Sequence, residues 1–419
     1  MGRQGEGNAL SSIACVRRER YVAAPRPHSA AVLSAAYTGI GLRRRESLTE
    51  ESTSDWCENE RIRYSQDNGR SWSEWRENPE EHPTQGEFVM EEVEFARGYD
   101  PQSGRMVRML FQRILRGEPA KALWDEHGHW DHMFWQVSGD DGLTWGPKHQ
   151  LRYEEGTEFN PAHWGDEEYL ATNQMYGGYN VIALRGGGIA YSGTIPTQHR
   201  GEQGEVEKVD GVACLVGHWN EARGAYEWTV SPRVAVSRRA SSRGLMEPCI
   251  AELAKGKLML EMRGSSTEVT PGRKWISVSD DGGRTWSGVS DLRYDDGERL
   301  YAPSTFARLL RSTKTGKLYW IGNISAEPPQ GNSPRYPLYI AEVNEEIPGL
   351  RRRTLTVIDD RDPNRDTPLL QLSNFSAFEN RETQEIELYL TRYGERGDGK
   401  SHVGDFWTAD VYKYVIALA

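Results

Sequence analysis

The sequence predicts an all-β protein, a six-bladed β-propeller in which four-stranded sheets surround a central axis. One octapeptide pattern, S-x-D-x-G-x-[ST]-W, occurs three times, at residues 65–72, 138–145 and 279–286. The second copy starts 73 residues after the first, and the third starts 141 residues after the second, about twice that interval. With ~70 residues per unit, the 419 residues hold six units. A composition of 14 Trp, 19 Tyr and 43 Gly is typical of many short strands joined by tight turns.

Each copy of the octapeptide is predicted to form a hairpin turn between two strands. The copies follow strand-like alternating runs, namely RIRYS, MFWQVS and KWISVS. In such a turn the Ser and Asp side chains accept hydrogen bonds from nearby backbone N–H groups. Gly69, Gly142 and Gly283 supply positive φ angles, and the Trp folds back on the hairpin as an apolar plug.

Weaker copies complete the six units. Residues 216–228 are predicted to be a degenerate copy in the unit without an octapeptide, and residues 340–345 and 388–394 have similar strand-then-turn patterns. No linker rich in Pro, Ser or Gly and no long amphipathic helix pattern divides the chain. We therefore expect a loosely structured N-terminal extension at residues 1–20 and a single propeller domain at residues 21–419.

Charge and composition narrow the classes of partner. A formal net charge of −11 would repel a phosphate backbone and disfavours a nucleic-acid partner. No window reaches the ~18 apolar residues of a membrane span, and the N-terminus lacks the apolar segment of a signal peptide. We therefore expect a soluble protein, cytoplasmic by default. The cysteines, Cys15, Cys57, Cys214 and Cys249, are scattered without a C-x-x-C pattern, so we expect neither a disulfide framework nor a metal or other cofactor.

The octapeptide resembles the Asp box, or BNR repeat, of the sialidase superfamily, and the resemblance extends from about residue 22 onward. It implies a six-bladed propeller and a glycoside hydrolase. Members of that family bind the carboxylate of sialic acid with three arginines. They cleave with an aspartate acid/base and with a tyrosine nucleophile that a glutamate activates. The family's boxes lie at the blade periphery, so function has to be inferred from other residues.

The first half of the chain supplies three candidates through this resemblance. Arg26 stands where the family has its first arginine in an F-R-I-P-like stretch, although the flanking Phe and Ile are absent. Arg44, in the run of arginines at 43–45, stands near the position of a further family arginine. Asp55 precedes the first octapeptide by ten residues, which is where the family has its acid/base aspartate.

The second half resembles the family more closely. Glu247, followed by the strand at 258–263 that ends in Arg263, resembles the segment with the activating glutamate and the second arginine. Side chains alternate along a strand, so Arg263 can face the axis only at the strand end. Arg335, before the strand at 338–341, resembles the third arginine.

The position of the nucleophile departs from the family pattern. Phe375 stands where the family has its tyrosine, and a phenyl ring cannot attack an anomeric carbon. Either Tyr336, Tyr389 or Tyr393 takes its place, or Glu247 activates a water molecule, which would imply inversion at the anomeric carbon.

Two further groups are candidates for substrate contact. His127, His129 and His132, with neighbouring acids, precede the second octapeptide and could contact substrate, ligate a metal or supply the general base of a lyase. Tyr176 and Tyr179 could stack on a sugar ring, and are equally well explained as packing aromatics.

These candidates together predict a sialidase-like, exo-acting glycoside hydrolase that releases a terminal acidic sugar. Asp55 and Glu247 form the predicted acid/base pair. The predicted substrate-binding residues are Arg26, Arg44, Arg263, Arg335, His132, Tyr176 and Tyr179. For a single arginine, a surface or inter-blade role is the simpler interpretation. Two other functions fit the same residues: a polysaccharide lyase acting on a uronic-acid-containing glycan, and a non-catalytic glycan-binding propeller.

Overall fold

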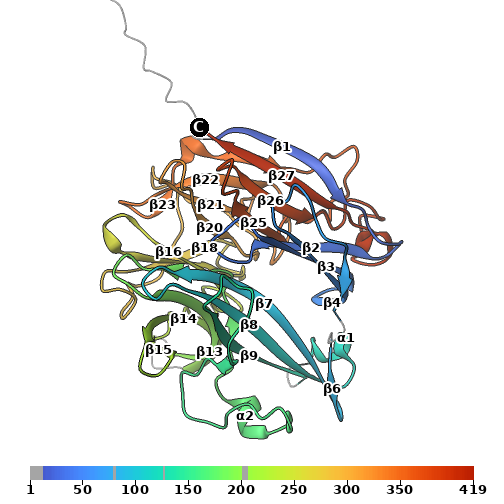
Figure 1. The fold of residues 1–419 in the computed structure, drawn as a ribbon. Coiled ribbons are helices and arrows are strands. Elements are labelled where there is room, and N and C mark those ends of the chain that lie inside the picture. Colours follow the sequence, from blue (N-terminus) through green and yellow to red (C-terminus); the bar gives the residue numbers. More distant parts are fainter. Residues whose placement is uncertain (1–12, 79–81, 126–127, 201–205) are drawn as a thin grey trace, which may run out of the picture.

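Six antiparallel sheets follow one another along the chain and are arranged as a β-propeller, which confirms the predicted fold class (Figure 1). The computed structural model describes residues 13–78, 82–125, 128–200 and 206–419. We number the sheets as blades 1 to 6 in chain order. The first strands of neighbouring blades contact one another, for example β2 with β25 and β16 with β20, so these strands surround the axis.

Blades 1 to 3 come from the first half of the chain. Blade 1 contains β2 (Ala30–Tyr37), β3 (Arg44–Thr53), β4 (Trp56–Ser65) and β5 (Arg76–Glu77). Blade 2 contains β6 (Thr84–Gln85), β7 (Phe88–Asp100), β8 (Arg105–Arg116), β9 (His129–Ser138) and β10 (His149–Gln150). Blade 3 contains β11 (Tyr176–Gly177), β12 (Ile182–Ala183), β13 (Ile189–Arg200), β14 (Val206–Asn220) and β15 (Ala225–Val230).

Blades 4 to 6 complete the ring. Blade 4 contains β16 (Met246–Glu252), β17 (Leu258–Arg263), β18 (Lys274–Ser279) and β19 (Ser290–Asp291). Blade 5 contains β20 (Arg308–Arg311), β21 (Leu318–Asn323), β22 (Leu338–Asn344), β23 (Gly349–Leu350) and β24 (Thr356–Asp359). Blade 6 contains β25 (Phe375–Glu379), β26 (Ile386–Thr391), β27 (Val411–Leu418) and β1 (Ile13–Val22).

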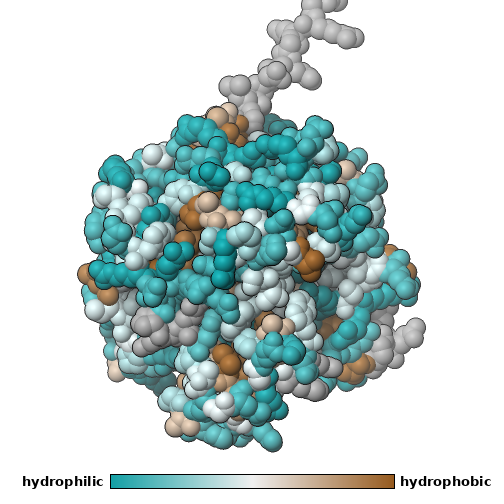
Figure 2. Space-filling model, turned by 90° about the vertical axis from the view of Figure 1, so that its right-hand side faces the viewer, coloured by the Kyte–Doolittle hydropathy of each residue, from teal (hydrophilic) through white to brown (hydrophobic). Residues whose placement is uncertain are grey.

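Helices are few and short in the described part of the chain. They are α1 (Pro119–Ala122), α2 (Glu167–Ala171) and the 3₁₀ turns η1 (Ala254–Gly256), η2 (Arg352–Thr354) and η3 (Gly404–Trp407). None of these helices is both long and apolar enough to cross a membrane. The face of the molecule seen in Figure 2 is mostly hydrophilic, and its apolar residues form small separate groups.

The first and last strands close the ring. Strand β1 pairs antiparallel with β27, with Val16 opposite Ile416, and Figure 1 shows the two side by side in blue and red. The residues from Ile13 to Arg20 are therefore the outer strand of blade 6, and the prediction of a loosely structured extension is wrong for them. The pairing could not be seen in the sequence because the two strands are separated by almost the whole chain.

All three octapeptides form turns between two strands, as predicted, and these turns join β4 to β5, β9 to β10 and β18 to β19. In the first, Ser65 Oγ accepts from the backbone N–H of Gly69 at 2.8 Å, and Asp67 Oδ1 accepts from that of Ser71 at 2.8 Å. Equivalent bonds form around Ser138 and Ser279, and Gly69, Gly142 and Gly283 have φ of 86°, 75° and 90°. These turns share one end of the propeller, which we call the octapeptide end.

The tryptophans of these turns differ from the predicted apolar plug in two of the three copies. The guanidinium of Arg63 lies 4.7 Å from the ring centre of Trp72, and that of Arg108 lies 4.4 Å from the ring centre of Trp145. Cation–π contacts of this kind stabilise an aromatic ring that lies among arginines. Only Trp286 packs against an apolar cluster, that between blades 3 and 4.

Apolar clusters between adjacent blades form the core. Four large clusters lie between blades 2 and 3, 3 and 4, 4 and 5, and 5 and 6, and a smaller one joins blade 6 to blade 1. Between blades 1 and 2 the apolar cluster of the described residues is limited to Trp56, Leu115 and Ala122, with Val89 and Leu123 beside it. One connection of each blade lies at the end opposite the octapeptides, which we call the site end, namely β3–β4, β8–β9, β13–β14, β17–β18, β21–β22 and β26–β27.

Candidate active site

Glu247 is held in a strained conformation at the site end of blade 4. It lies where the pairing of β16 with β17 shifts register, and its φ of 45° is unusual for a residue with a side chain. Its backbone N–H donates to Thr194 Oγ1 of blade 3 at 2.9 Å, which holds this conformation. Only 8% of the residue is exposed. Strain of this kind persists where the surrounding structure imposes it, and it is concentrated at functional sites.

Arg263 forms an ion pair with Glu247. The guanidinium donates from Nη1 to Glu247 Oε1 at 2.6 Å and from Nε to Ser304 Oγ at 2.9 Å. Burial by itself would lower the pKa of the Arg263 guanidinium. The adjacent Glu247 carboxylate has the larger effect, so the pKa is raised. The second oxygen, Glu247 Oε2, is buried and has no hydrogen-bond partner among the described residues. The pair therefore leaves one carboxylate oxygen available.

Arg335 lies beside Arg263 without a carboxylate of its own. It comes from the connection between β21 and β22, and it donates to Ser373 Oγ at 3.2 Å and to the backbone oxygen of Asn332 at 3.3 Å. Within the described part of the chain, no carboxylate oxygen lies within 4.0 Å of its guanidinium. Burial, followed by repulsion from Arg263, lowers the pKa of Arg335 to about 10. An anion between these two arginines would relieve that repulsion.

Asp55, Tyr176 and Tyr179 complete what we call the axial cluster, whose other members are Glu247, Arg263 and Arg335. Asp55 is exposed in the turn between β3 and β4, and its charge acts on Arg335 and Tyr176. The hydroxyls of Tyr176 and Tyr179 lie 3.2 Å apart, and burial followed by the charge of Glu247 raises the pKa of both. The members come from blades 1, 3 and 4 and from the connection in blade 5, and side chains of such separate blades interact only near the axis.

Two buried glutamates near this cluster were not found from the sequence. Burial raises the pKa of both Glu51 and Glu91 to about 7, although Tyr393 donates to Glu51 and Arg113 lies 3.9 Å from Glu91. The charge of Asp55 acts on both of them. Each lies on a strand next to a second glutamate and has no motif around it, so only the burial seen in the fold identifies it. A carboxyl group with a pKa near 7 is suited to proton transfer at neutral pH.

Arg26 and Arg44 do not join the axial cluster. Arg26 pairs with Glu50 at 3.4 Å on the surface, with 60% of its side chain exposed. Arg44 is buried at the octapeptide end, where it pairs with Glu387 at 2.8 Å and donates to Tyr389 Oη at 2.9 Å. The prediction that Arg44 binds substrate is therefore wrong, because a carboxylate of blade 6 already neutralises it. Two of the four predicted arginines are brought together.

The histidine group is also dispersed. His132 is fully buried, stacks on the ring of Tyr169 with centroids 4.2 Å apart, and contacts the backbone oxygen of Tyr169 at 3.0 Å through Nε2. Asp131 pairs with Arg113 at 2.7 Å, and His129 contacts the backbone of Ala122. His127 lies outside the described residues. Because His132 has no access to solvent, the prediction that it contacts substrate is wrong, and it offers no general base for a lyase.

Of the aromatic residues considered as nucleophiles, Phe375 and Tyr389 have other roles in the fold, whereas Tyr393 lies near the axial cluster, where its charge acts on Arg335. Phe375 begins β25 and packs on Phe306, with ring centroids 5.0 Å apart. Tyr389 donates to Glu387 at the octapeptide end, and Tyr393 donates to Glu51. Tyr176 and Tyr179 are the tyrosines on which the Glu247 charge acts.

Solved structures of other proteins share this fold. The chain matches a protein of unknown function from Dyadobacter fermentans DSM 18053 with 13% identity and a TM-score of 0.59, covering 96% of this chain and 99% of the other. It matches the K499G mutant of NanB sialidase from Streptococcus pneumoniae with 12% identity and a TM-score of 0.56, covering 96% and 70%. It matches the intramolecular trans-sialidase from Ruminococcus gnavus with 11% identity and a TM-score of 0.52, covering 91% and 94%.

At these identities the likeness shows the fold alone. No protein-family sequence model matches the chain, and no curated protein sequence matches it. Any function therefore has to be argued from the residues of the axial cluster.

Proposed function

We propose that this protein is a glycoside hydrolase that releases a terminal acidic sugar from a glycan. The observation that carries the proposal is the pair of adjacent guanidiniums at Arg263 and Arg335, of which only Arg263 has a carboxylate partner among the described residues. Planar guanidiniums bind carboxylates through paired hydrogen bonds, so a sugar carboxylate is the anion that would fit between them. The sialidase folds among the structural neighbours support the same reaction class.

Asp55 and Glu247 carry the chemical roles in this proposal. Asp55 donates a proton to the glycosidic oxygen as the bond to the anomeric carbon breaks, and it is exposed at the site end as a donor to an entering glycan has to be. Glu247 takes a proton through its free oxygen, Oε2, from the attacking group. That group is a water molecule, or the hydroxyl of Tyr176 or Tyr179, on both of which the Glu247 charge acts.

A hollow beside Asp55 supports binding of the rest of the glycan. It has a volume of about 310 Å³, and its lining includes Ser54, Trp124 and Trp407. Trp124 is 68% exposed, which is unusual for so large an apolar side chain. Exposed indole rings are suited to stacking on sugar rings.

The experiment compares 4-methylumbelliferyl glycosides of sialic acid, a uronic acid and galactose. We expect turnover of an acidic glycoside and none of the neutral galactoside. Arg335→Gln should raise KM more than tenfold, whereas Arg26→Gln, a matched change outside the axial cluster, should leave KM unchanged. Asp55→Ala should abolish turnover, and activity that survives it would remove Asp55 from the acid role and leave Glu91 as the next donor to test.

Two other outcomes would replace the proposal with its alternatives. An unsaturated uronate product, detected by its ultraviolet absorbance, would show a lyase. Calorimetric binding of an acidic sugar, with no turnover of any glycoside, would show a glycan-binding propeller without catalysis.

A further inference from the structure

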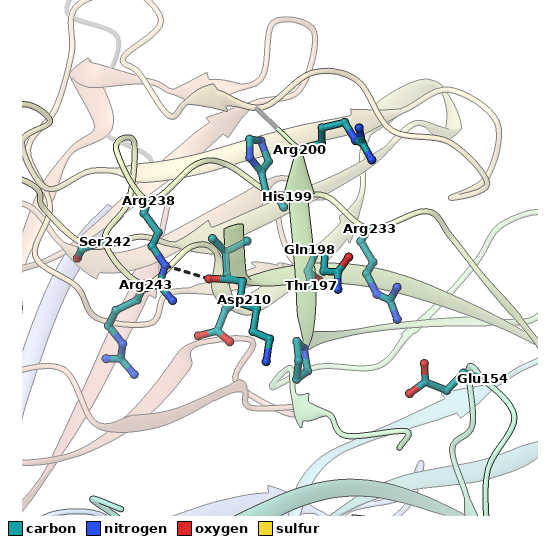
Figure 3. Close-up of a pocket in the computed structure, with 14 residues that line it drawn as sticks. Glu154, Thr197, Gln198, His199, Arg200, Asp210, Arg233, Arg238, Ser242 and Arg243 are labelled. Carbon is teal, nitrogen blue, oxygen red and sulfur yellow. Dashed lines mark hydrogen bonds between the residues drawn. The ribbon is translucent and has the colours of Figure 1, made fainter. Parts of the chain in front are cut away.

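A basic groove lies next to the axial cluster at the site end of blade 3. It has a volume of about 880 Å³ and follows the β13–β14 hairpin, which projects beyond the rest of the blade (Figure 3). Five basic side chains line it: Arg200, Lys208, Arg233, Arg238 and Arg243. Figure 3 shows Arg238 and Arg243 on one side of the hairpin and Arg233 on the other.

Within the described part of the chain, none of these five cations is in an ion pair. All five residues are exposed, and no carboxylate of a described residue lies within 4.0 Å of any of their charged groups. Among the described residues, the acidic residues of the lining are Glu154 and Asp210, and Glu207 lies beside it, where its carboxylate accepts from the backbone N–H of Arg238 at 2.9 Å. Burial raises the pKa of Asp210, although the charges of Arg243 and Arg238 oppose this rise. In a chain of net charge −11, this is a local concentration of positive charge.

The groove is joined to the axial cluster by a short stretch of backbone. The N–H of Asp210 donates to the oxygen of Arg243 at 3.2 Å, and the N–H of Leu245 donates to the oxygen of Asp210 at 2.8 Å. Glu247 follows two residues later and donates to Thr194, on the same strand as the groove residues 196–200. Arg243 is four residues from Glu247, so their backbones are at most ~14 Å apart.

We propose that this groove binds the continuing chain of a polyanionic glycan, one that carries carboxylates or sulfates on several successive sugars. The inference rests on the proposed function only for the direction of the chain, with its acidic end at the axial cluster. Exposed arginines and a lysine pair with sulfate and carboxylate groups, while Thr197, Gln198 and Ser242 offer hydrogen bonds to hydroxyls.

The composition of the lining favours a glycan over the other polyanions. Its described residues include no Trp, Tyr or Phe, which a site for single-stranded nucleic acid would use to stack bases, and the nearby ring of Tyr153 lies against Arg233, 5.3 Å from its guanidinium. It also lacks the large apolar anchors at the centre of protein interfaces, since its apolar side chains are limited to Pro196, Val209 and Ala235.

The test measures binding of fluorescein-labelled heparin to the full chain by anisotropy, with unlabelled polygalacturonate, dextran and oligo-dT as competitors. We expect heparin and polygalacturonate to compete and neutral dextran not to compete. The double variant Arg233→Gln/Arg243→Gln should weaken binding about tenfold or more and lower the salt dependence of log Kd by about two.

The control, Arg284→Gln/Arg353→Gln, removes the same charge from exposed arginines outside the groove. An equal loss in the control would overturn the proposal, since binding would then follow net charge alone. Absence of heparin binding, or stronger competition by oligo-dT than by polygalacturonate, would overturn it as well. Turnover of a monosaccharide glycoside should be unchanged in the groove variant, so failure of the groove and failure of the axial site are separate results.

Discussion

Replacing Arg44 with Met tests whether this arginine stabilises the fold instead of binding substrate. Arg44 and Glu387 pair at 2.8 Å with 2% and 5% of their side chains exposed. Burial alone would favour the neutral acid, yet Arg44, Asn380 and Lys413 hold the pKa of Glu387 at about 2, against the usual 4.5. That difference corresponds to ~3 kcal/mol of stability at neutral pH. Arg44→Met leaves a buried carboxylate short of a partner, so we expect a loss of ~3 kcal/mol.

The measurement is urea unfolding followed by tryptophan fluorescence at pH 7 and at lower pH. The folded pKa of Glu387 is depressed, so its contribution is present above pH ~4.5 and is lost as the pH falls through about 2. The difference between wild type and Arg44→Met should shrink over that window. Arg17→Met is the control, because Arg17 pairs with Glu385 at the same 2.8 Å but is 61% exposed, and we expect a change below ~1 kcal/mol. Equal losses from the two substitutions would refute the reasoning.

Three further predictions concern the turns, the thiols and the closing strand. Asp140→Ala should lower the thermal midpoint at pH 7 and leave it unchanged near pH 2, because hydrogen bonds from Thr144 hold the pKa of Asp140 at about 2. A shift of the thermal midpoint that is independent of pH would contradict this. Thiol-labelling mass spectrometry should find the exposed Cys15 modified at once and Cys249 modified only after unfolding, since burial raises the pKa of Cys249 to about 12. Prompt labelling of Cys249 would contradict its burial. Deleting residues 1–20 should lower the thermal midpoint and promote aggregation by exposing the edge of β27, whereas a chain that starts at Ile13 keeps β1 and should not.

The propeller could be predicted because its strongest signal is local. The hydrogen bonds of the Ser65 and Asp67 side chains in the first octapeptide turn join residues within a span of four, such as Ser65 to Gly69, so these two motif residues explain the turn locally. The pairing of β1 with β27 has no such signal, because the register between Val16 and Ile416 is fixed by the closed ring. A sequence read from its first residue therefore gives no sign that residues 13–20 belong to the last blade.

The candidate site was predictable where a local sequence pattern marks its residues. Glu247 and Arg263 lie on adjacent strands of one sheet, with Met246 opposite Arg263, and the sequence pattern identified both. Arg44 was misassigned because it starts β3 opposite Ser65, at the octapeptide end, and because its partner Glu387 comes from the last blade. Glu91 was missed for the related reason that its burial comes from the assembled blades and not from its neighbours in the sequence.

The two ends of the propeller divide stability from chemistry. At the octapeptide end, short turns are closed by their own side chains, and the Arg44–Glu387 pair joins blades 1 and 6. At the site end, the connections vary more in length, from the two residues between β3 and β4 that include Asp55 to the 14 residues between β21 and β22 that include Arg335, and the basic groove lies at the same end. Loops on a rigid scaffold can change without loss of the fold, which is why binding residues gather on them. Glu247 differs because it lies at the start of an inner strand, where its backbone is strained and is fixed by the hydrogen bond to Thr194. A bound glycan should therefore reposition the surrounding loops while the Glu247 carboxylate stays in place.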